Sequence, residues 1–349
     1  MTRINFNFYG FQVLIASVFY NEEDLVFVND FSYFKQKNEK NKNFNLKIYL
    51  SKLSHFSKHG VRIGTTRLSE FRQIDFKTRQ YIYNKNSKSI ATSFDRISKK
   101  NRFFHLKSNE AQAINEILYY YILSVVGEYF DTIGLMRVHA CSFAQVNDGS
   151  TVVWGLPGAG KSTLATLLTL FEDSRQLQVL SDEMSLIELN KKIVCPFPMR
   201  FSLKKETALL INKMLDSTES KKISFGTKGF FFDKKLTVDC QASLFSQLSK
   251  APLNNFYVLE KSHLFSVEKI NFLSKFKLYY KLIFGIGLIQ MYEYFIRLEN
   301  LPALIKILHN RIKLCATIHK LPIKILKRGS NFSTNHEQLL LFFKQNKSD

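Results

Sequence analysis

The sequence predicts an α/β fold in which a basic, β-rich N-terminal region, residues 1–108, precedes a second domain, residues 109–349. Two observations predict this class. Residues 35–107 contain short alternating or aromatic runs separated by Asn, Lys and Ser, as at 44–50 and 80–83, which is typical of strands and turns. Beyond Asn109 the spacing becomes helical, and a buried strand then leads directly into a glycine-rich loop and another helix.

Composition bounds the class of protein. The 349 residues are 45% hydrophobic and 23% charged, close to the globular average, so wholesale disorder is excluded. The net charge is +21, and residues 35–107 hold 19 Lys and Arg against four acidic residues. This positive charge would attract an acidic acceptor. A general bias of the composition toward Lys and Asn explains the excess of positive charge as well. The polar run at 37–43 is interpreted as a solvated loop, and nucleic-acid binding is disfavoured.

Cysteine spacing and apolar runs indicate the compartment. Cys141, Cys195, Cys240 and Cys315 are dispersed, which disfavours structural zinc and a disulfide scaffold. The first residues lack a signal-peptide pattern. The longest apolar run, 282–292, is too short to span a bilayer, for which about 20 residues are needed. We therefore expect a cytoplasmic protein with no membrane span.

The second domain is predicted element by element. A helix begins near Asn109, with apolar residues at three- and four-residue spacing up to Tyr129. A strand over 134–146, a hairpin turn at 147–150 and a buried strand over 151–155 follow. Later, 177–181 is expected as a strand, 268–316 as helical, and 321–326 as an edge strand because Pro322 lies near its start.

The strongest motif spans residues 155–163, a full match to G-x-x-x-x-G-K-[ST] between the buried strand and a helix. Its glycines allow backbone conformations in which successive N–H groups converge on phosphate oxygens at the positive end of the helix. Lys161 would reach the β- and γ-phosphates, and the Ser162 hydroxyl would complete a Mg²⁺ shell. The predicted nucleotide-binding residues are Gly155, Pro157, Gly158, Ala159, Gly160, Lys161, Ser162 and Thr163.

Two carboxylates follow the next predicted strand. Asp182 and Glu183 come about twenty residues after Lys161, at what would be the carboxyl edge of the sheet. Asp182 is suited either to take a proton from a substrate hydroxyl or to hold Mg²⁺, and Glu183 is better suited to the metal. The predicted metal ligands are therefore Ser162, Asp182 and Glu183. His139, in the hairpin before the loop, is a candidate to tune Asp182, although a histidine in a strand is usually structural.

These residues resemble the catalytic domain of HPr kinase/phosphorylase, and more closely the HPr-kinase-like serine kinases found beside lasso-peptide biosynthesis genes. The resemblance rests on Val138-His139-Ala140, the glycine-rich loop, Leu180-Ser181-Asp182-Glu183, and a proline-rich step, 196–201, that contains Arg200. It is specific over residues 134–201. Segments 251–260, 8–11 and 15–17 give weaker support.

The resemblance implies a P-loop core with a mixed sheet, related to phosphoenolpyruvate carboxykinase, and a kinase that uses ATP and Mg²⁺. It implies that Asp182 is the catalytic base, that His139 pairs with it, that Lys161 acts on the phosphates, and that Arg200 contacts phosphate or substrate. Glu183 stands where the family usually has Asp, which keeps the charge but leaves the metal geometry open. The glycine-rich segment of the phosphorylase reaction is missing, so neither phosphorolysis nor HPr as substrate is carried over.

Three functions stay open at this stage. The first is a kinase that phosphorylates Ser or Thr of a peptide or protein. The second is a P-loop ATPase that switches a protein or nucleic-acid partner, with the basic region as its contact surface. The third is a kinase of small metabolites. The acceptor, the phosphate donor and any homo-oligomeric state are not encoded in these motifs.

Overall fold

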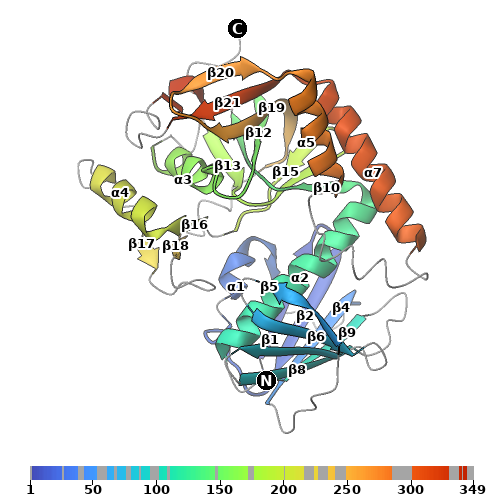
Figure 1. Ribbon diagram of the computed structural model, residues 1–349. Helices are drawn as coiled ribbons and strands as arrows, with labels where there is room; N and C mark the ends of the chain where they lie inside the picture. Colours follow the sequence, from blue (N-terminus) through green and yellow to red (C-terminus); the bar gives the residue numbers. More distant parts are fainter. Residues whose placement is uncertain are drawn as a thin grey trace. The chain divides into compact units, whose positions relative to one another are not determined.

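The structure is a computed structural model (Figure 1). It divides into two compact units that meet in the sequence between Val126 and Gly127, inside a long helix. We describe each unit by itself. The residues that the structure describes are 2–25, 27–37, 43–52, 61–66, 69–75, 80–85, 88–94, 102–107, 111–145, 148–171, 177–199, 201–215, 224–226, 235–239, 249–284, 301–329, 338–339 and 341–343.

The first unit is built on a nine-stranded mixed sheet in the order β3-β1-β2-β4-β9-β8-β7-β6-β5. This sheet confirms the expected β-rich N-terminal region. Tyr9 and Gly10, with φ of 51° and 97°, form the tight turn that joins the first two strands. The strands are β1 (Thr2–Phe8), β2 (Phe11–Ser17), β3 (Lys35–Gln36), β4 (Leu46–Ser51), β5 (Val61–Thr66), β6 (Ser69–Asp75), β7 (Gln80–Lys85), β8 (Lys88–Phe94) and β9 (Arg102–Lys107).

Short helices and the first turns of a long one complete this unit. They are α1 (Phe27–Asp30), η1 (Ser32–Phe34) and α2 (Ala111–Ile133). The Asn115 amide ties α2 to the segment before α1, since it accepts from the Phe27 N–H and donates to the Asp24 carbonyl. The predicted helix after Asn109 is thus confirmed as α2. It ends at Gly134, whose φ of 83° is the left-handed conformation that commonly terminates helices.

The second unit contains a mixed sheet in the order β10-β14-β15-β19-β12-β11-β13, with β21 beside β19 and β20 beside β21. At its centre β12, β19 and β21 run parallel, whereas β11 lies antiparallel between β12 and β13. The fold is therefore α/β with mixed sheets. The strands are β10 (Leu135–Val138), β11 (Ala140–Gln145), β12 (Gly149–Gly155), β13 (Leu177–Ser181), β14 (Ser185–Glu188), β15 (Ile193–Cys195), β19 (Ala251–Lys261), β20 (Ser266–Lys269) and β21 (Ile323–Arg328); β16 (Phe201–Lys204), β17 (Ser224–Gly226) and β18 (Lys235–Asp239) form a separate small sheet.

Two sequence-based expectations for this sheet are wrong. The single strand expected over 134–146 is broken at His139, because β10 pairs with β14 while β11 pairs with β12 and β13. The expected edge strand, now β21, is instead flanked by β19 on one side and β20 on the other. The polar strand β20 covers this edge, and its last two residues fall inside the run that was expected to be helical.

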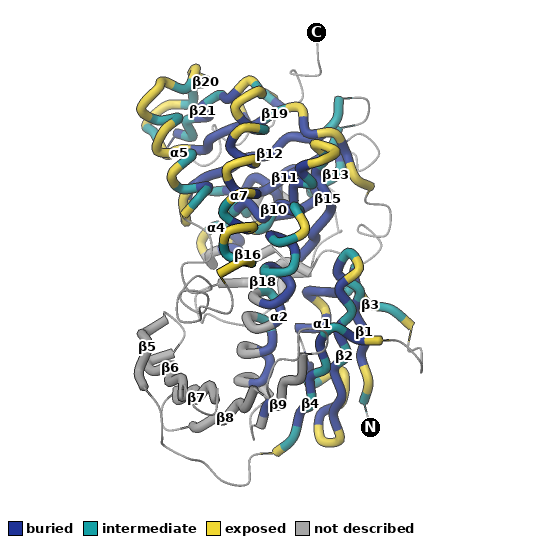
Figure 2. Tube along the Cα trace, turned by 90° about the vertical axis from the view of Figure 1, so that its right-hand side faces the viewer, coloured by how far each residue is buried: buried dark blue, intermediate teal, exposed yellow. Residues whose placement is uncertain are grey.

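Helices cover both faces of the central sheet (Figure 1). Helix α3 (Lys161–Phe171) and helix α4 (Lys205–Leu215) bury apolar side chains against one face, together with Val153 of β12. Helix α5 (Phe272–Phe284) and helix α7 (Leu301–His319) pack on the other face, where Trp154 lies. Alternate residues of β12 thus face two different cores, and Figure 2 shows this strand buried while α5 retains exposed turns.

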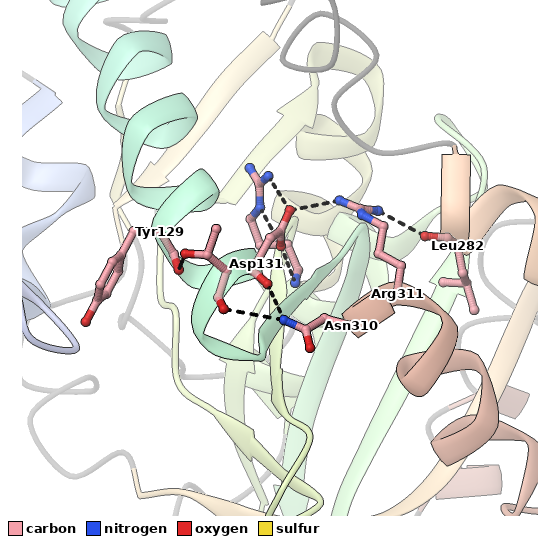
Figure 3. A network of polar contacts seen from close by, with 7 residues as sticks. Tyr129, Asp131, Leu282, Asn310 and Arg311 are labelled. Carbon is pink, nitrogen blue, oxygen red and sulfur yellow. Dashed lines mark hydrogen bonds and ion pairs between the residues drawn. The ribbon is translucent and has the colours of Figure 1, made fainter. Parts of the chain in front are cut away.

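A buried ion cluster joins the end of α2 to β10 and α7 (Figure 3). The Arg137 guanidinium donates to both carboxylate oxygens of Asp131, at 3.2 and 2.7 Å, and Arg311 donates to Asp131 Oδ2 at 2.9 Å. Arg311 also donates to the Leu282 carbonyl of α5, and the Asn310 amide donates to the Asp131 carbonyl. Burial by itself would raise the pKa of Asp131, but the two guanidinium charges and their hydrogen bonds lower it below its ordinary value.

Candidate nucleotide-binding site

Strand register brings three separated segments to one edge of the sheet in the second unit. In the antiparallel pairing of β11 with its two neighbours, Ala140 lies opposite Trp154 and Ser142 lies opposite Ser181. His139, Gly155 and Asp182 are the next residues outward on their three strands. The hairpin, the glycine-rich loop and the acidic pair predicted from sequence therefore share an edge.

The loop between β12 and α3 has the backbone that its glycines were expected to allow. Gly158 and Gly160 have φ of 80° and 108°, a region that other residues rarely adopt. Gly155 has a different role, because a Cβ there would lie 2.9 Å from the Leu259 carbonyl oxygen of the neighbouring strand. The Ala159 N–H donates to the Leu156 carbonyl, and Leu164 donates to Gly160, where the helical bonding of α3 begins.

Lys161 and the two residues after it occupy the first turn of α3. The Lys161 ammonium is buried and donates to the carbonyls of Gly155 and Leu156, at 2.7 and 3.3 Å, which holds it against the loop. Ser162 is half-buried and Thr163 is buried. The first N–H groups of a helix have no partner within the helix, and together with its dipole they favour an anion at this end.

Asp182 is buried, whereas Glu183 is exposed. The thiol of Cys141, on β11, reports the surroundings of Asp182. Burial raises the pKa of that thiol, the negative charge of Asp182 raises it further, and the positive charge of Lys161 opposes the increase. Both charged groups therefore lie near enough to the Cys141 thiol to influence its pKa.

His139 lies at the break between β10 and β11 and is half-buried. Its Nδ1 is 3.1 Å from the backbone carbonyl of Glu183, the residue after Asp182. Because a carbonyl oxygen can only accept, Nδ1 carries the proton in this contact. This bond fixes the imidazole beside the acidic segment. A direct pairing of His139 with Asp182 remains a prediction.

The predicted metal ligands are only partly brought together. Ser162 lies in the first turn of α3 and Asp182 follows β13 at the same sheet edge. Hydroxyl and carboxylate oxygens are ligands that Mg²⁺ accepts. The side chain of Glu183 is exposed, unlike that of Asp182. No group of three His, Cys, Asp or Glu side chains able to hold a metal occurs within the described part of the chain. A hydroxyl and a carboxylate suit a Mg²⁺ ion that also binds phosphate oxygens, which is how Mg²⁺ is commonly bound.

One residue at this edge was missed by the sequence argument. Arg328 ends β21, and a Cβ placed on Gly160 would lie 2.6 Å from its Nη1 atom. The side chain is half-buried, and burial lowers the pKa of its guanidinium. No local motif marks Arg328. It could have been predicted only by knowing that β21 pairs with β19, the strand beside β12. The residue that was proposed instead, Arg200, lies outside the described residues.

Comparison with known protein families and with curated proteins finds no match to this chain. Within the described ranges, no helix has both the length and the apolar character that crossing a bilayer requires.

Proposed function

We propose that the protein is an ATP-dependent phosphotransferase, which transfers the γ-phosphate to a hydroxyl group of Ser or Thr in a peptide or protein. A single observation carries the proposal. A strand, a loop with the full G-x-x-x-x-G-K-[ST] sequence and a helix lie at the same sheet edge as a buried carboxylate, Asp182. A loop of this kind serves phosphate binding, and a nearby buried carboxylate is what a hydroxyl acceptor needs for activation.

The reaction needs few protein groups. Asp182 would accept the proton of the acceptor hydroxyl while that oxygen forms a bond to the γ-phosphorus, and the bond from the γ-phosphorus to the β-phosphate oxygen breaks to release ADP. Lys161 and the loop N–H groups would bind the phosphate oxygens and stabilise the charge that develops on them. His139, fixed through Glu183, would position or tune Asp182. Ser162, together with Asp182 or Glu183, would hold Mg²⁺, which would supply neutralising charge for the β- and γ-phosphates.

The proposal includes a particular type of P-loop fold for the second unit. A parallel trio, β12, β19 and β21, flanked by the antiparallel β11, is compatible with a P-loop core of the HPr kinase and phosphoenolpyruvate carboxykinase type. Such an enzyme would use cytoplasmic ATP. Its basic N-terminal region would suit an acidic acceptor, since residues 35–107 hold most of the net positive charge.

The decisive experiment follows phosphate from [γ-³²P]ATP with Mg²⁺ into a library of Ser and Thr peptides and into small alcohols. Wild type is compared with Asp182→Asn and Lys161→Ala. Asp148→Asn is the matched control, because Asp148 lies beside the start of β12, at the opposite end of that strand from the loop. We expect label in peptides with wild type and Asp148→Asn, and its loss in both site variants.

The other outcomes separate the alternatives. Label in small alcohols alone would make the protein a metabolite kinase. Phosphate release without transfer, stimulated by nucleic acid or by a protein, would replace the kinase with an ATPase switch. Full transfer by Asp182→Asn would refute the assignment of the base.

A further inference from the structure

Arg328 extends the proposed site toward a strand that no motif marks. In the parallel pairing of β19 with β21, Lys261 lies opposite Arg328, and in that of β12 with β19, Gly155 lies opposite Leu259. The carboxyl ends of all three strands therefore meet at the edge that holds the loop. The position of a Cβ on Gly160 would be 2.6, 3.1 and 3.4 Å from Arg328 Nη1, Cζ and Nε, so the Nε–Cζ–Nη1 side of the guanidinium lies against the last residue of the loop.

This guanidinium lacks the partners that a buried cation normally has. Its Nε is buried and has no hydrogen-bond partner, and no carboxylate forms an ion pair with Arg328 in the ranges that the structure describes. Partial burial disfavours its charge, as the lowered pKa indicates. Lys161 and the amino end of α3 add positive potential at the same place. Three sources of positive potential thus converge where the loop sequence predicts an anion.

We infer that Arg328 binds phosphate oxygens of the nucleotide held by the loop, as a fixed cation that acts together with Lys161. Gly160 is required here for two reasons, its φ of 108° and the room it leaves for the guanidinium. Arginine suits this task, because its planar fork can donate two hydrogen bonds to one phosphate group. This inference rests on the proposed function, since it assigns a further phosphate contact at the same site.

The experiment measures binding of Mg²⁺-ATP and of inorganic tripolyphosphate by calorimetry. Wild type, Arg328→Ala and Arg328→Lys are compared with Lys327→Ala, a control in which the neighbouring charge, paired with Glu268, is removed. We expect Arg328→Ala to weaken ATP binding by about tenfold or more, as the loss of a charge-assisted hydrogen bond implies. Tripolyphosphate should lose the same factor, Arg328→Lys should recover part of it, and Lys327→Ala should bind like wild type.

A second measurement distinguishes a binding role from a structural one. Without nucleotide, Arg328→Met should unfold at a higher temperature than wild type, because it removes a partly buried charge that has no ion-pair partner. On addition of ATP, the same variant should gain less in unfolding temperature than wild type. A stabilising substitution that weakens binding is the opposite of what a structural arginine would give.

The negative outcomes are distinct. If wild type binds ATP and Arg328→Ala binds it equally well, the role of Arg328 is overturned while the proposed function stands. Weakened ATP binding with unchanged tripolyphosphate binding would place the contact on the nucleoside and overturn the phosphate assignment. If wild type binds neither ATP nor tripolyphosphate, the proposed function and this inference both fail.

Discussion

The second unit contains two arginine environments that differ in how their charges are balanced. Arg137 and Arg311 share the carboxylate of Asp131 and are 4% and 2% exposed, and Arg311 also donates to a backbone carbonyl (Figure 3). Arg328 is half-buried against the glycine-rich loop, and no ion pair joins it to any residue that the structure describes. A cluster in which both guanidinium groups bond to a shared carboxylate holds elements together, whereas a cation at a loop with no carboxylate partner among the described residues is suited to a ligand.

The difference follows from the cost of desolvation. A buried charge is tolerated when an opposite charge and hydrogen bonds compensate the water it has lost. The Asp131 cluster meets this condition without a ligand. At the loop, phosphate oxygens of a bound nucleotide would supply the same compensation. Without nucleotide, replacing Arg328 with an apolar residue should therefore raise the unfolding temperature. Replacing Asp131 should instead lower the free energy of unfolding strongly.

The largest effect is expected for Asp131→Asn. The amide would leave two buried guanidinium groups without their counter-charge, and breaking a buried ion pair from one side typically costs about 3–5 kcal/mol. Urea unfolding followed by circular dichroism measures this loss. An unfolding free energy within error of wild type would show that the cluster carries little of the stability and would remove the contrast with Arg328.

The lowered pKa of Asp131 predicts that the protein loses stability at acidic pH. Its pKa is lowered in the folded state relative to the ordinary value of 3.8, so its stabilising contribution is present above that value and is lost as pH falls through the folded pKa. The unfolding temperature of wild type should therefore decline below about pH 4, and that of Asp131→Asn should decline less. Parallel declines in the two proteins would contradict the assignment.

Gly127→Ala tests the same cluster from the helix side. A Cβ on Gly127 would lie 1.9 Å from Arg137 Nη1, and the bidentate bond to Asp131 prevents the guanidinium from moving away freely. Overpacking of this kind costs about 1–3 kcal/mol. Ile133→Ala, at an exposed position of the same helix, is the control and should have a small effect. Equal losses in the two variants would show that the contact with Arg137 is not the cause.

Gly160→Ala and Gly158→Ala form a matched pair at the loop. Both positions have positive φ, so each alanine should cost about 1–2 kcal/mol of stability through strain. Only at Gly160 would the methyl group also displace Arg328, because a Cβ on Gly158 has no atom within 4 Å. ATP binding, measured by calorimetry, should therefore weaken more in Gly160→Ala. The reverse order would argue against Arg328 as a phosphate contact.

The fold was predictable where local pattern decides it. Helical spacing located α2, and the strand, loop and helix around residues 149–171 followed from apolar runs and glycine. The break at His139 and the interior position of β21 were not predictable, because they depend on which distant strands pair. Strand partners across a large sequence separation leave no local signal in a single chain.

The residues of the candidate site also fall into those that the sequence predicts and those that it does not. The residues from Gly155 to Thr163 and the pair Asp182–Glu183 were identified from motif and spacing. Arg328 carries no motif, and it reaches the loop only because β21 runs parallel to β19. The cluster around Asp131 was missed for a similar reason. Arg137 is only six residues from Asp131 in the sequence, but Arg311 is 180 residues away and meets Asp131 only because α7 packs beside the end of α2.

The smallest effect is expected for Lys327→Ala. Lys327 precedes Arg328 on β21 and forms an ion pair with Glu268 of β20. Exposed pairs of this kind contribute little, because water screens them and two flexible side chains must be held in place. Neither the unfolding temperature nor ATP binding should change beyond error. Both neighbouring cations are half-buried, and within the described part of the chain only Lys327 has a carboxylate partner. A loss of ATP binding in Lys327→Ala would therefore mean that general positive potential acts at this edge, and the specific contact assigned to Arg328 would fail.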